Sequence, residues 1–592
     1  MSKNCILGIS TSGHGVGACV CVNGQVLSAN TLERITRKKY DIMLPLTRTD
    51  LKLLGWNAEP QHYKYNIDLP FDLVNDPQEI DFFKVAGFSE LIDHVLSAAG
   101  KTIKDVDCVA YGFRYINSVE KYFRSINPNI EFIVPEHHFA HACQAFLPSP
   151  FEEAAILIVD GQGLPLKRTN GDPLSGCLAH GRGNSIKVLK ELSALSSLGS
   201  LYAHITKLCG FKTNEDGKTM GLAPYGTPRL YDKYMDQIRY KDGSFNLRDI
   251  ARFVKNGFKD DGYLYTFGKL SNYLDTVKPR APKGEFTDEY KDLAYMGQRI
   301  IEDVMSYLAD WLYRETGSEN LCIVGGVGLN CVANYKVFAK SKFKNVFVYP
   351  NCGDNGLCVG QALYAYNVAA GNKRIYISTN DYMGMQYSDA DIKKAIDKFT
   401  SPSLEVKEYS DMNMLYEDMA SLIVDAHITS WYQGRSEFGP RALGNRSILA
   451  DPRRKDMKDI LNSRVKFRES FRPFTPSVLE ERANEFFTLD VPSPFMLLAP
   501  LVRPGKGELV PAITHVDNTA RVQTVSKDVN ERYYNLIKAF EKRTGIPMLL
   551  DTSFNVAGQP IVETPEDAIK CFLSTDIDAL GIGNYLLKKV KK

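Results

Sequence analysis

Three of the ten histidines in this chain stand within five residues, in the stretch Pro135-Glu-His-His-Phe-Ala-His141. On a helix, His137 and His141 are four positions apart, so both imidazoles project from one face about one turn apart. Two ring nitrogens at this spacing can hold one metal ion. His138 lies three positions before His141, so a second ligand pair exists, and spacing alone does not choose between them. A structural reading also stays open, in which the helix packs in a core and its histidines only form hydrogen bonds.

Two aspartates that follow strand-like apolar runs can supply carboxylate ligands. Asp160 follows Ala154-Ala-Ile-Leu-Ile-Val159 and opens the loop Asp-Gly-Gln-Gly, and Asp354 follows a second run near Asn345. His137, His141, Asp160 and Asp354 would make a mixed nitrogen and oxygen site with open positions, which suits Fe2+, Mn2+ or Zn2+ rather than calcium. Near bound phosphates such an ion orients oxygens and neutralises charge.

Cationic side chains gather in the C-terminal half among rigid turn formers. The motifs are Trp431–Arg446, Arg464–Pro476, Thr514–Arg521 and Asp551–Asn555. Arginine presents a planar fork that matches phosphate oxygens in pairs and keeps its charge at any relevant pH. The residues expected to converge on a small phosphorylated substrate are Arg441, Lys466, Arg472, Arg521 and Ser553.

Two other interpretations of these motifs are a solvated basic face and a nucleic-acid surface. Interleaved aromatics such as Phe438, Phe467 and Phe474 argue against a solvated basic face. Aromatics between arginines can also stack on nucleic-acid bases. The formal net charge of +2 and nearby acids such as Glu437 and Glu469 favour a pocket for a small anion over a nucleic-acid surface.

Composition sets the class of protein. With 592 residues the chain is too long for one core, and its 44% hydrophobic and 24% charged residues are ordinary for a globular protein. The twelve cysteines form no CxxC pair, which argues against a zinc ribbon or a disulfide framework. No apolar run approaches the ~18–20 residues of a membrane span, and the N-terminus does not resemble a signal peptide. We therefore expect a reduced cytoplasmic protein that does not bind membranes.

The elements that must position these residues follow a pattern that occurs twice. The chain opens with a strand at 5–11, a glycine loop at 12–17, a strand at 18–22 and a tight turn at Asn23-Gly24. A strand, the DGQG loop and a hairpin-like piece at 176–181 repeat this pattern after residue 155. Two such halves predict the duplicated α/β architecture of the actin-like ATPase and sugar-kinase superfamily.

Several further segments have recognisable patterns. Residues 79–100 and 292–315 are expected to be helices, and Leu321–Asn334 is expected to be a strand, a glycine loop and a helix start that lets backbone approach a nucleotide. The basic stretch 32–40 is typical of a solvated surface. Residues 230–290 are typical of an insertion that covers a cleft. The pattern loosens near residue 369, which places a domain boundary between about 365 and 400.

Taken together, these motifs resemble the O-carbamoyltransferase family of antibiotic and nodulation-factor biosynthesis over nearly the whole chain. The similar blocks are HHFAH, DGQG, GKTMGLAPYG, GGVGLN, CGDNG, GRSEFGPRALGNRSILADPR, VKFRESFRPF, DNTARVQ and DTSFN. The resemblance implies an actin-like (ASKHA) N-terminal domain at 1–368, similar to the threonylcarbamoyl transferases of tRNA modification. It further implies a linker region at 369–399 and a YrdC-like mixed α/β domain at 400–592.

The resemblance also implies a reaction. The YrdC-like domain would take carbamoyl phosphate and ATP, with Mg2+, release phosphate, and form carbamoyl-adenylate with loss of pyrophosphate. The N-terminal domain would then pass the carbamoyl group to a hydroxyl of a small natural product. A reactive mixed anhydride must be kept from water, so a closed internal route between the two sites is expected.

Site residues follow from the same resemblance. The metal-ligand positions of the family fall on His137, His141, Asp160 and Asp354. The metal expected first is Fe2+, followed by Mn2+ or Zn2+. The adenylate positions fall on Asp160, Gly161, Gly163, Gly325, Gly326 and Asn330. Arg441, Lys466, Arg472, Arg521, Ser553 and Asn555 fall where the family handles carbamoyl phosphate and ATP, and Arg441, Lys466 and Arg472 are expected to be catalytic.

One position departs from the family pattern. The first loop of the family reads His-Asp, whereas this chain has His14-Gly15, so His14 becomes a catalytic candidate on the acceptor side. Residues 40–80 and 230–290 match the family least and are expected to form the acceptor pocket. The expected partners are a small hydroxylated acceptor and a second copy of the chain in a homodimer, with no nucleic acid. A threonylcarbamoyl-type RNA modifier and a non-catalytic ATP-binding scaffold remain as alternatives.

Overall fold

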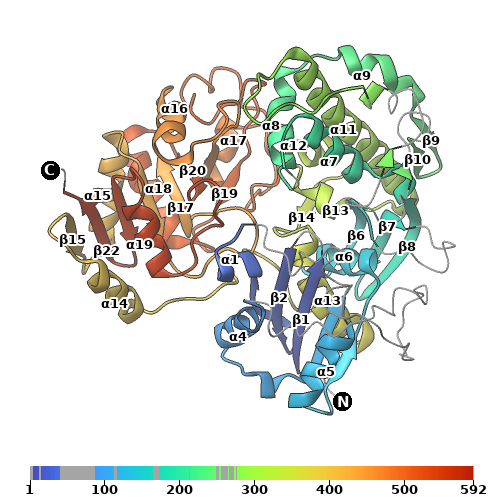
Figure 1. The fold of residues 1–592 in the computed structure, drawn as a ribbon, viewed down its shortest axis with the longest axis horizontal. Helices are drawn as coiled ribbons and strands as arrows, with labels where there is room; N and C mark the ends of the chain where they lie inside the picture. Colours follow the sequence, from blue (N-terminus) through green and yellow to red (C-terminus); the bar gives the residue numbers. More distant parts are fainter. Residues whose placement is uncertain are drawn as a thin grey trace. The chain divides into compact units, whose positions relative to one another are not determined.

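The computed structural model describes residues 4–12, 15–39, 87–112, 116–163, 173–212, 214–247, 253–254, 264–265, 273–274 and 276–590. The contacts divide the chain into two compact units, whose elements are labelled in Figure 1. The N-terminal unit comprises residues 1–27 and 42–378, and the C-terminal unit comprises residues 28–41 and 379–592. Within the described residues, none of the helices combines the length and the apolar composition that crossing a bilayer requires.

The first sheet of the N-terminal unit has the strand order β3-β2-β1-β4-β5. In this sheet β1 (Cys5–Ser12) is antiparallel to β2 (Gly15–Val22) and parallel to β4 (Cys108–Gly112), and β4 is parallel to β5 (Glu131–Ile133). The two residues between β2 and β3 (Gln25–Thr31) have positive φ angles of 50° and 82°. Such angles are typical of the tight hairpin turn that the Asn-Gly pair predicts.

The second sheet of this unit repeats the plan of the first, with the order β14-β13-β6-β7-β8. Here β6 (Glu153–Val159) is antiparallel to β7 (Leu174–Arg182) and parallel to β13 (Asn320–Val324). The strand β7 is antiparallel to β8 (Ser185–Ser193), and β13 is parallel to β14 (Asn345–Val348). A hairpin followed by two parallel strands therefore occurs twice, which confirms the predicted duplicated actin-like α/β fold.

Two helices lie between these sheets (Figure 1). The helix α6 (His137–Phe146) packs on β6 and β13, α13 (Leu357–Leu363) packs on β1 and β2, and the two helices contact each other. The close packing of α13 depends on Gly8 in β1, where an added Cβ would come within 2.1 Å of the Cys358 carbonyl oxygen. The residue before α6, Glu136, caps this helix: its carboxylate accepts hydrogen bonds from the backbone N–H groups of His138 and Phe139.

The predicted helices of this unit are present with adjusted bounds. The long amphipathic helix α11 spans Asp288–Thr316, and α4 spans Phe88–Ala98. Residues 79–86 of the expected first helix lie outside the described residues, as do residues 40–80. The expected insertion at 230–290 is described in part, with α9 (Arg229–Tyr234), β9 (Arg239–Lys241) and β10 (Ser244–Asn246).

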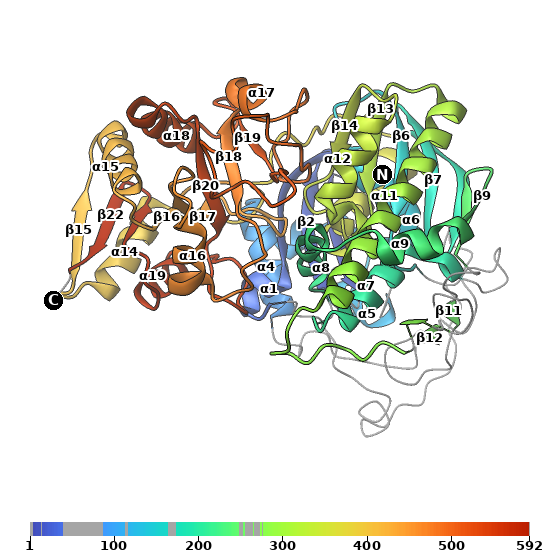
Figure 2. The same ribbon diagram turned by 90° about the horizontal axis from the view of Figure 1, so that it is seen from above.

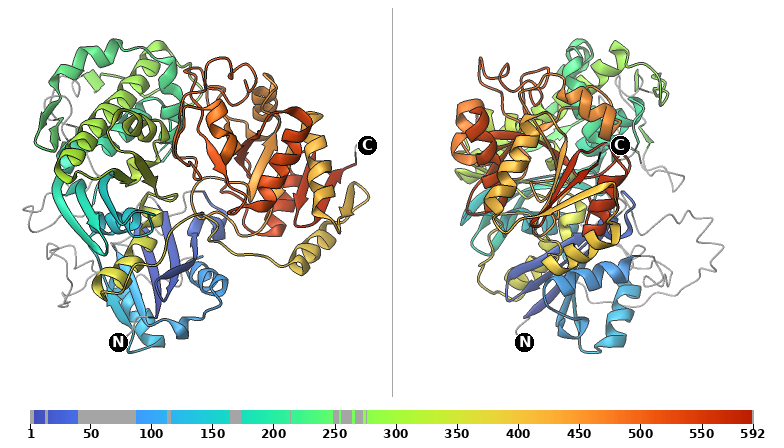
Figure 3. Two further views of the ribbon diagram at one scale, coloured as in Figure 1. Left: turned by 180° about the vertical axis from the view of Figure 1, so that it is seen from behind. Right: turned by 90° about the vertical axis from the view of Figure 1, so that its left-hand side faces the viewer.

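The C-terminal unit is mixed α/β and is built on one eight-stranded sheet with the order β15-β22-β21-β16-β17-β20-β18-β19. The strands are β15 (Leu404–Glu408), β16 (Thr429–Tyr432), β17 (Arg446–Ala450), β18 (Thr475–Leu479), β19 (Gln523–Val525), β20 (Met548–Ser553), β21 (Ala579–Ile582) and β22 (Tyr585–Lys589). The last strand, β22, drawn in red in Figure 3, lies between β15 and β21.

Helices cover both faces of this sheet. Figure 2 shows α15 (Met412–Val424) and α18 (Glu531–Thr544) on one face, and α14 (Asp389–Phe399) and α19 (Pro565–Leu573) on the other. The helix α14 falls inside the segment 369–399 that the sequence marks as a linker, and its Ser388 cap forms a complete capping box with Asp391.

The short helix α1 (Leu32–Thr36) lies in the basic stretch that was expected to be a solvated surface. This expectation is wrong for Arg34, whose side chain is only 1% exposed. Its guanidinium donates a hydrogen bond to the Gly439 carbonyl oxygen at 2.9 Å, so a residue near the N-terminus is part of the C-terminal unit. A local run of basic residues cannot reveal a partner that lies 405 positions away.

Candidate metal centre and anion site

The structure brings His137, His141, Asp160 and Asp354 together, and one ligand atom from each lies within 4.8 Å of all the others. The Nε2 atom of His137 is 3.0 Å from Asp160 Oδ2 and 3.8 Å from Asp354 Oδ1. The Nε2 atom of His141 is 3.6 Å from Asp160 Oδ2 and 3.3 Å from Asp354 Oδ1. Both histidines come from one face of α6. Asp160 directly follows β6, and Asp354 lies in the segment after β14; both strands are parallel to β13, which lies between them.

The side chain of Gln144 fixes how His141 presents its ring. The Nε2 group of Gln144 donates hydrogen bonds to the carbonyl oxygens of Asn351 at 2.5 Å and Gly353 at 3.3 Å. Carbonyl oxygens only accept, so the amide oxygen of Gln144 must face His141 Nδ1, 2.7 Å away. The Nδ1 atom of His141 therefore carries a proton, and Nε2, which faces the aspartates, is the atom left to bind a metal ion once its own proton is displaced.

The electrostatics of the cluster show how strongly the carboxylates favour positive charge there. Burial opposes the charged form of His141, but its interactions with Asp160 and Asp354 raise its pKa to about 10. Burial likewise opposes the charge of Asp160, yet the hydrogen bonds from His137 and His141 hold its pKa well below the usual range. Burial and the charge of Asp160 raise the pKa of Asp354, but His141 and His137 bring it below its usual value. A divalent cation can take the place of the protons that neutralise this cluster.

The third histidine, His138, is not one of the four clustered residues. Neither of its ring nitrogens has a hydrogen-bond partner in the described part of the chain, and Nδ1 lies 3.5 Å from Glu136 Oε1. Burial lowers the pKa of His138. The ring contacts Gly163, where an added Cβ would come within 2.5 Å of His138 Cε1. The structure thus favours His137, and not His138, as the partner of His141.

The predicted adenylate loops meet at Asp160. Its Oδ1 accepts a hydrogen bond from the backbone N–H of Gly326 at 2.9 Å, while its Oδ2 faces the histidines. The carbonyl oxygen of Gly161 accepts a hydrogen bond from Ser197 at 2.6 Å. The side chain of Asn330 caps α12 (Cys331–Lys340) and bonds to Gln298. Gly325 opens the predicted turn between β13 and this helix with a φ of 93°.

In the C-terminal unit the predicted anion residues Lys466, Ser553 and Asn555 are in direct contact. The Lys466 ammonium, 5% exposed, donates to the backbone carbonyl of Ser553 and to Asn555 Oδ1 at 2.8 Å. Ser553 Oγ donates to the same Asn555 oxygen at 2.8 Å. Burial, followed by the positive charge of Arg468, lowers the pKa of Lys466 well below its usual range.

More cations surround this lysine. Arg468, which the sequence analysis did not single out, stacks over the Phe474 ring at 4.1 Å and donates to Asn462 Oδ1 at 3.3 Å. Burial and then the charges of Arg472 and Arg521 lower the pKa of Arg468. An excess of buried positive charge in one place is what binding of a phosphorylated ligand requires. Only its position between Lys466 and Arg472 in VKFRESFR could have signalled Arg468.

Of two more predicted residues, Arg441 is described by the structure and His14 is not. Arg441 lies on the loop between β16 and β17, and its Nε atom is buried. Backbone N–H groups of this loop, from Leu443, Asn445 and Arg446, donate to the buried Glu437 carboxylate. His14 lies outside the described residues.

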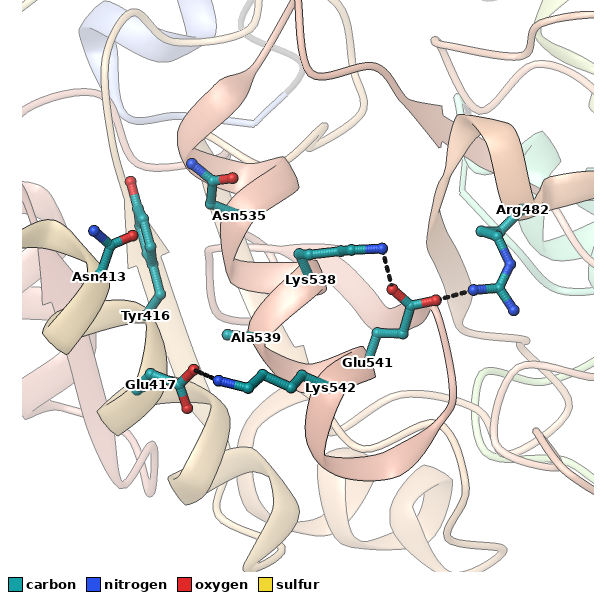
Figure 4. Close-up of a pocket in the computed structure, with 9 residues that line it drawn as sticks. All are labelled: Asn413, Tyr416, Glu417, Arg482, Asn535, Lys538, Ala539, Glu541 and Lys542. Atoms are coloured by element: carbon teal, nitrogen blue, oxygen red, sulfur yellow. Dashed lines mark hydrogen bonds and ion pairs between the residues drawn. The ribbon is translucent and has the colours of Figure 1, made fainter.

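A pocket of about 570 Å³ lies over α15 and α18 (Figure 4). Its lining includes two acids, each of which bonds to cations. Glu541 bonds to Lys538 at 2.7 Å and to Arg482, and Glu417 lies 3.6 Å from Lys542. The lining carries these two acids and three cations, each of which pairs with one of the acids, and it shares no residue with the predicted sites.

Comparison with known proteins identifies the family. The family described as "Carbamoyltransferase N-terminus" matches residues 5–363, and "Carbamoyltransferase C-terminus" matches residues 420–589. The chain belongs to the carbamoyltransferase family. This result confirms the resemblance seen in the sequence, and it identifies the protein as a member of a transferase family.

Three relatives show how far the carbamoyltransferase similarity extends. An uncharacterized protein of Synechocystis is 35% identical over 99% of this chain and 96% of its own length. The nodulation protein NolNO of Sinorhizobium fredii is 36% identical over 84% of this chain and 74% of its own length. The 3'-hydroxymethylcephem-O-carbamoyltransferase of Streptomyces clavuligerus is 29% identical over 68% of this chain and 72% of its own length.

Proposed function

We propose that this carbamoyltransferase uses carbamoyl phosphate and ATP to form carbamoyl-adenylate and then carbamoylates a hydroxyl of a small molecule. The observation that supports this proposal most is the presence of two chemically different sites in two units. One is a buried cluster of two histidines and two aspartates beside glycine loops, and the other is a cation-rich site around Lys466. A reaction that first makes and then consumes an adenylate can use one site for each step. The family name and the relative that acts on a hydroxymethylcephem support an oxygen acceptor.

The first half-reaction is assigned to the C-terminal unit. Water cleaves carbamoyl phosphate into carbamate and phosphate, and a carbamate oxygen then attacks the α-phosphorus of ATP and expels pyrophosphate. Lys466, Arg468 and Arg472 would bind the phosphate oxygens and neutralise the charge that builds up on the departing groups. The main-chain and side-chain oxygens of Ser553 and Asn555 hold the Lys466 ammonium in place for this role.

The second half-reaction is assigned to the N-terminal unit. The acceptor hydroxyl attacks the carbamoyl carbon, the bond to AMP breaks, and the hydroxyl proton leaves. The glycine loops at Gly161 and Gly325 would bind the AMP portion through backbone N–H groups. Asp160 orients the second loop through its bond to Gly326 N–H.

The donor set of the cluster fits a divalent transition metal, because two imidazole nitrogens and two carboxylate oxygens converge and Gln144 fixes the ligand tautomer of His141. His137, His141, Asp160 and Asp354 would hold the ion, with Fe2+ proposed first. When bound, such an ion supplies Lewis-acid stabilisation of negative charge on oxygen.

The test is to incubate the purified protein with ATP and carbamoyl phosphate and to measure pyrophosphate, AMP and carbamoyl-adenylate. We expect pyrophosphate release that depends on carbamoyl phosphate, and AMP release that rises when a suitable hydroxyl acceptor is added. The Lys466→Ala variant should lose the first step. Failure to detect any carbamoyl-adenylate or pyrophosphate above a control without carbamoyl phosphate would refute the proposal.

A further inference from the structure

The segment Ser28–Lys39, here called the N-terminal strap, is far in sequence from the other residues of the C-terminal unit but belongs to it. It contains the end of β3, the helix α1 and three residues after it. The backbone N–H of Ala29 donates to the carbonyl oxygen of Met383 at 3.0 Å. Arg37, which ends α1, has a left-handed backbone with a φ of 61°, a conformation that non-glycine residues adopt only where their surroundings favour it.

Arg34 of the strap bonds to the loop that carries Arg441. Its Nη2 atom donates to the carbonyl oxygen of Gly439 at 2.9 Å, and the N–H of the same glycine donates to Asp381 Oδ2 at 2.7 Å. Arg34 and Asp381 are both at least 98% buried, so water cannot replace the hydrogen bonds that these side chains form with Gly439. The loop is thereby fixed two residues before Arg441.

Arg37 of the strap bonds to the loop that carries Asn555. Its guanidinium donates to the carbonyl oxygens of Ile561 at 2.6 Å and Pro560 at 3.2 Å. Its Nε atom lies 3.6 Å from Asp567 Oδ1 in α19. The neighbouring residue Gln559 accepts a hydrogen bond from Asn555 Nδ2 at 2.7 Å.

The same contacts continue to the lysine of the anion site. Asn555 donates from its amide nitrogen to the Gln559 carbonyl, so its amide oxygen is left to accept from Lys466 Nζ at 2.8 Å. A chain of adjacent polar contacts thus runs from Arg37 through the 559–561 backbone and Asn555 to Lys466. The strap also adds charge near this lysine, since after burial and Arg468 the charge of Lys39 contributes to its lowered pKa.

We propose that Arg34 and Arg37 are positioning residues of the anion site, and that the strap is a functional part of the C-terminal unit. Arg37 holds the loop that presents Asn555 to Lys466, and Arg34 holds the loop of Arg441, which the sequence predicts to bind the same anion. The proposal rests on the proposed function only in taking this site as the place where carbamoyl phosphate and ATP react. It implies that residues from both ends of the sequence are needed to build one phosphate-binding site.

The test uses the full-length protein with Arg37→Ala and Arg37→Lys, and with Lys38→Ala as the matched control, because Lys38 is the exposed neighbour of Arg37. Hydrogen exchange is measured on residues 553–563, and the affinity for inorganic pyrophosphate by calorimetry. The Lys466→Ala variant defines the share of that binding that belongs to the anion site. We expect Arg37→Ala to speed exchange in 553–563 and to weaken pyrophosphate binding about tenfold.

Arg37→Lys should restore binding only in part, because one ammonium does not reproduce the fork that bonds to two carbonyl oxygens. Lys38→Ala should match the wild type in both measurements. Arg37→Ala with wild-type exchange in 553–563 and wild-type pyrophosphate affinity would overturn the proposal, as would faster exchange spread evenly over the whole chain. If the wild type bound pyrophosphate but made no carbamoyl-adenylate, the proposed function would fail while these two measurements would still decide the role of the strap.

Discussion

The amide of Gln144 gives a sharp test of the proposed metal centre, because it bonds to the proposed ligand His141 without being a ligand itself. Replacing it by leucine keeps the approximate volume and removes both of its polar groups. The Nδ1–H of His141 then loses its acceptor at 2.7 Å, and the carbonyl oxygens of Asn351 and Gly353 lose their donor. Without that acceptor, no hydrogen bond holds the His141 proton on Nδ1. The tautomer that carries its proton on Nε2 cannot bind a metal through Nε2.

The size of the effect follows from these lost contacts. A buried polar group left without its partner costs about 1–3 kcal/mol. Loss of an outer-shell partner of a ligating histidine typically lowers metal affinity about 10–100-fold. We therefore expect Gln144→Leu to weaken metal binding by that factor and to lower the free energy of unfolding by about 2–4 kcal/mol.

The assay is titration of the metal-free protein with Co2+ or Fe2+, followed by visible absorption and calorimetry. Gln298→Leu is the matched control, since it also removes a buried glutamine of the same unit, one that bonds to Asn330 and Glu302. Gln144→Glu separates the two functions of the amide, because it keeps an acceptor for His141 but loses the donor to the two carbonyls. Wild-type metal affinity in a folded Gln144→Leu protein would show that the tautomer argument is incorrect.

Three further outcomes are expected. His137→Ala should abolish metal binding and carbamoyl transfer while pyrophosphate release from ATP and carbamoyl phosphate continues; equal loss of both would contradict the division into two half-reactions. Binding of a divalent metal at pH 7 should release protons, because His141 has a pKa of about 10 without metal, and apparent affinity should rise with pH; calorimetry in buffers of different ionisation enthalpy measures the release. Burial raises the pKa of Asp551 from 3.8 to about 7, so the folded protein keeps a proton that the unfolded chain loses, and the resulting stability, roughly 4 kcal/mol, is present below pH 3.8 and lost as pH rises through 7. Asp551→Asn should flatten this part of the pH dependence in denaturant titrations, and an unchanged slope would contradict the assignment.

Hydrogen bonds to Asp551 limit the rise in its pKa that burial causes, because the hydroxyl donors Tyr533, Ser447 and Ser477 favour the charged carboxylate. Its Oδ2 lies 2.9 Å from the Tyr533 hydroxyl and 3.0 Å from the Ser477 hydroxyl. Ser477 has a second acceptor, Gln523 Oε1, at 2.7 Å, and the amide nitrogen of Gln523 is used by the Leu443 carbonyl. A hydroxyl has one proton to donate, so when Ser477 donates to Gln523 its hydrogen bond no longer favours the charged form of Asp551.

The sequence was sufficient for the features that depend on local spacing. The i, i+4 histidines of α6 and an aspartate after each apolar strand are visible in one dimension, and the strand and hairpin pattern predicted the duplicated fold. These features were predictable because helix and strand periods fix which side chains share a face or an edge.

Features that depend on distant partners were missed for a physical reason. Gln144 is an ordinary residue of a helix until the backbone of residues 351–353 is placed against it. Arg34 and Arg37 belong to a basic run, and such runs are most often solvated, yet their acceptors lie 405 and 524 positions away. Burial of a charge is decided by these partners and not by its neighbours in sequence.

The strap has a consequence for how the protein folds as it is synthesised. Arg37 emerges from the ribosome early, but its acceptor at Ile561 is made 524 residues later. At about 5–20 residues per second this interval lasts roughly 25–100 s. During that time the strands of the N-terminal unit can form, while the arginines of the strap have no native acceptors for their hydrogen bonds. The C-terminal unit can therefore complete its packing only by capturing a segment that left the ribosome before any other part of that unit.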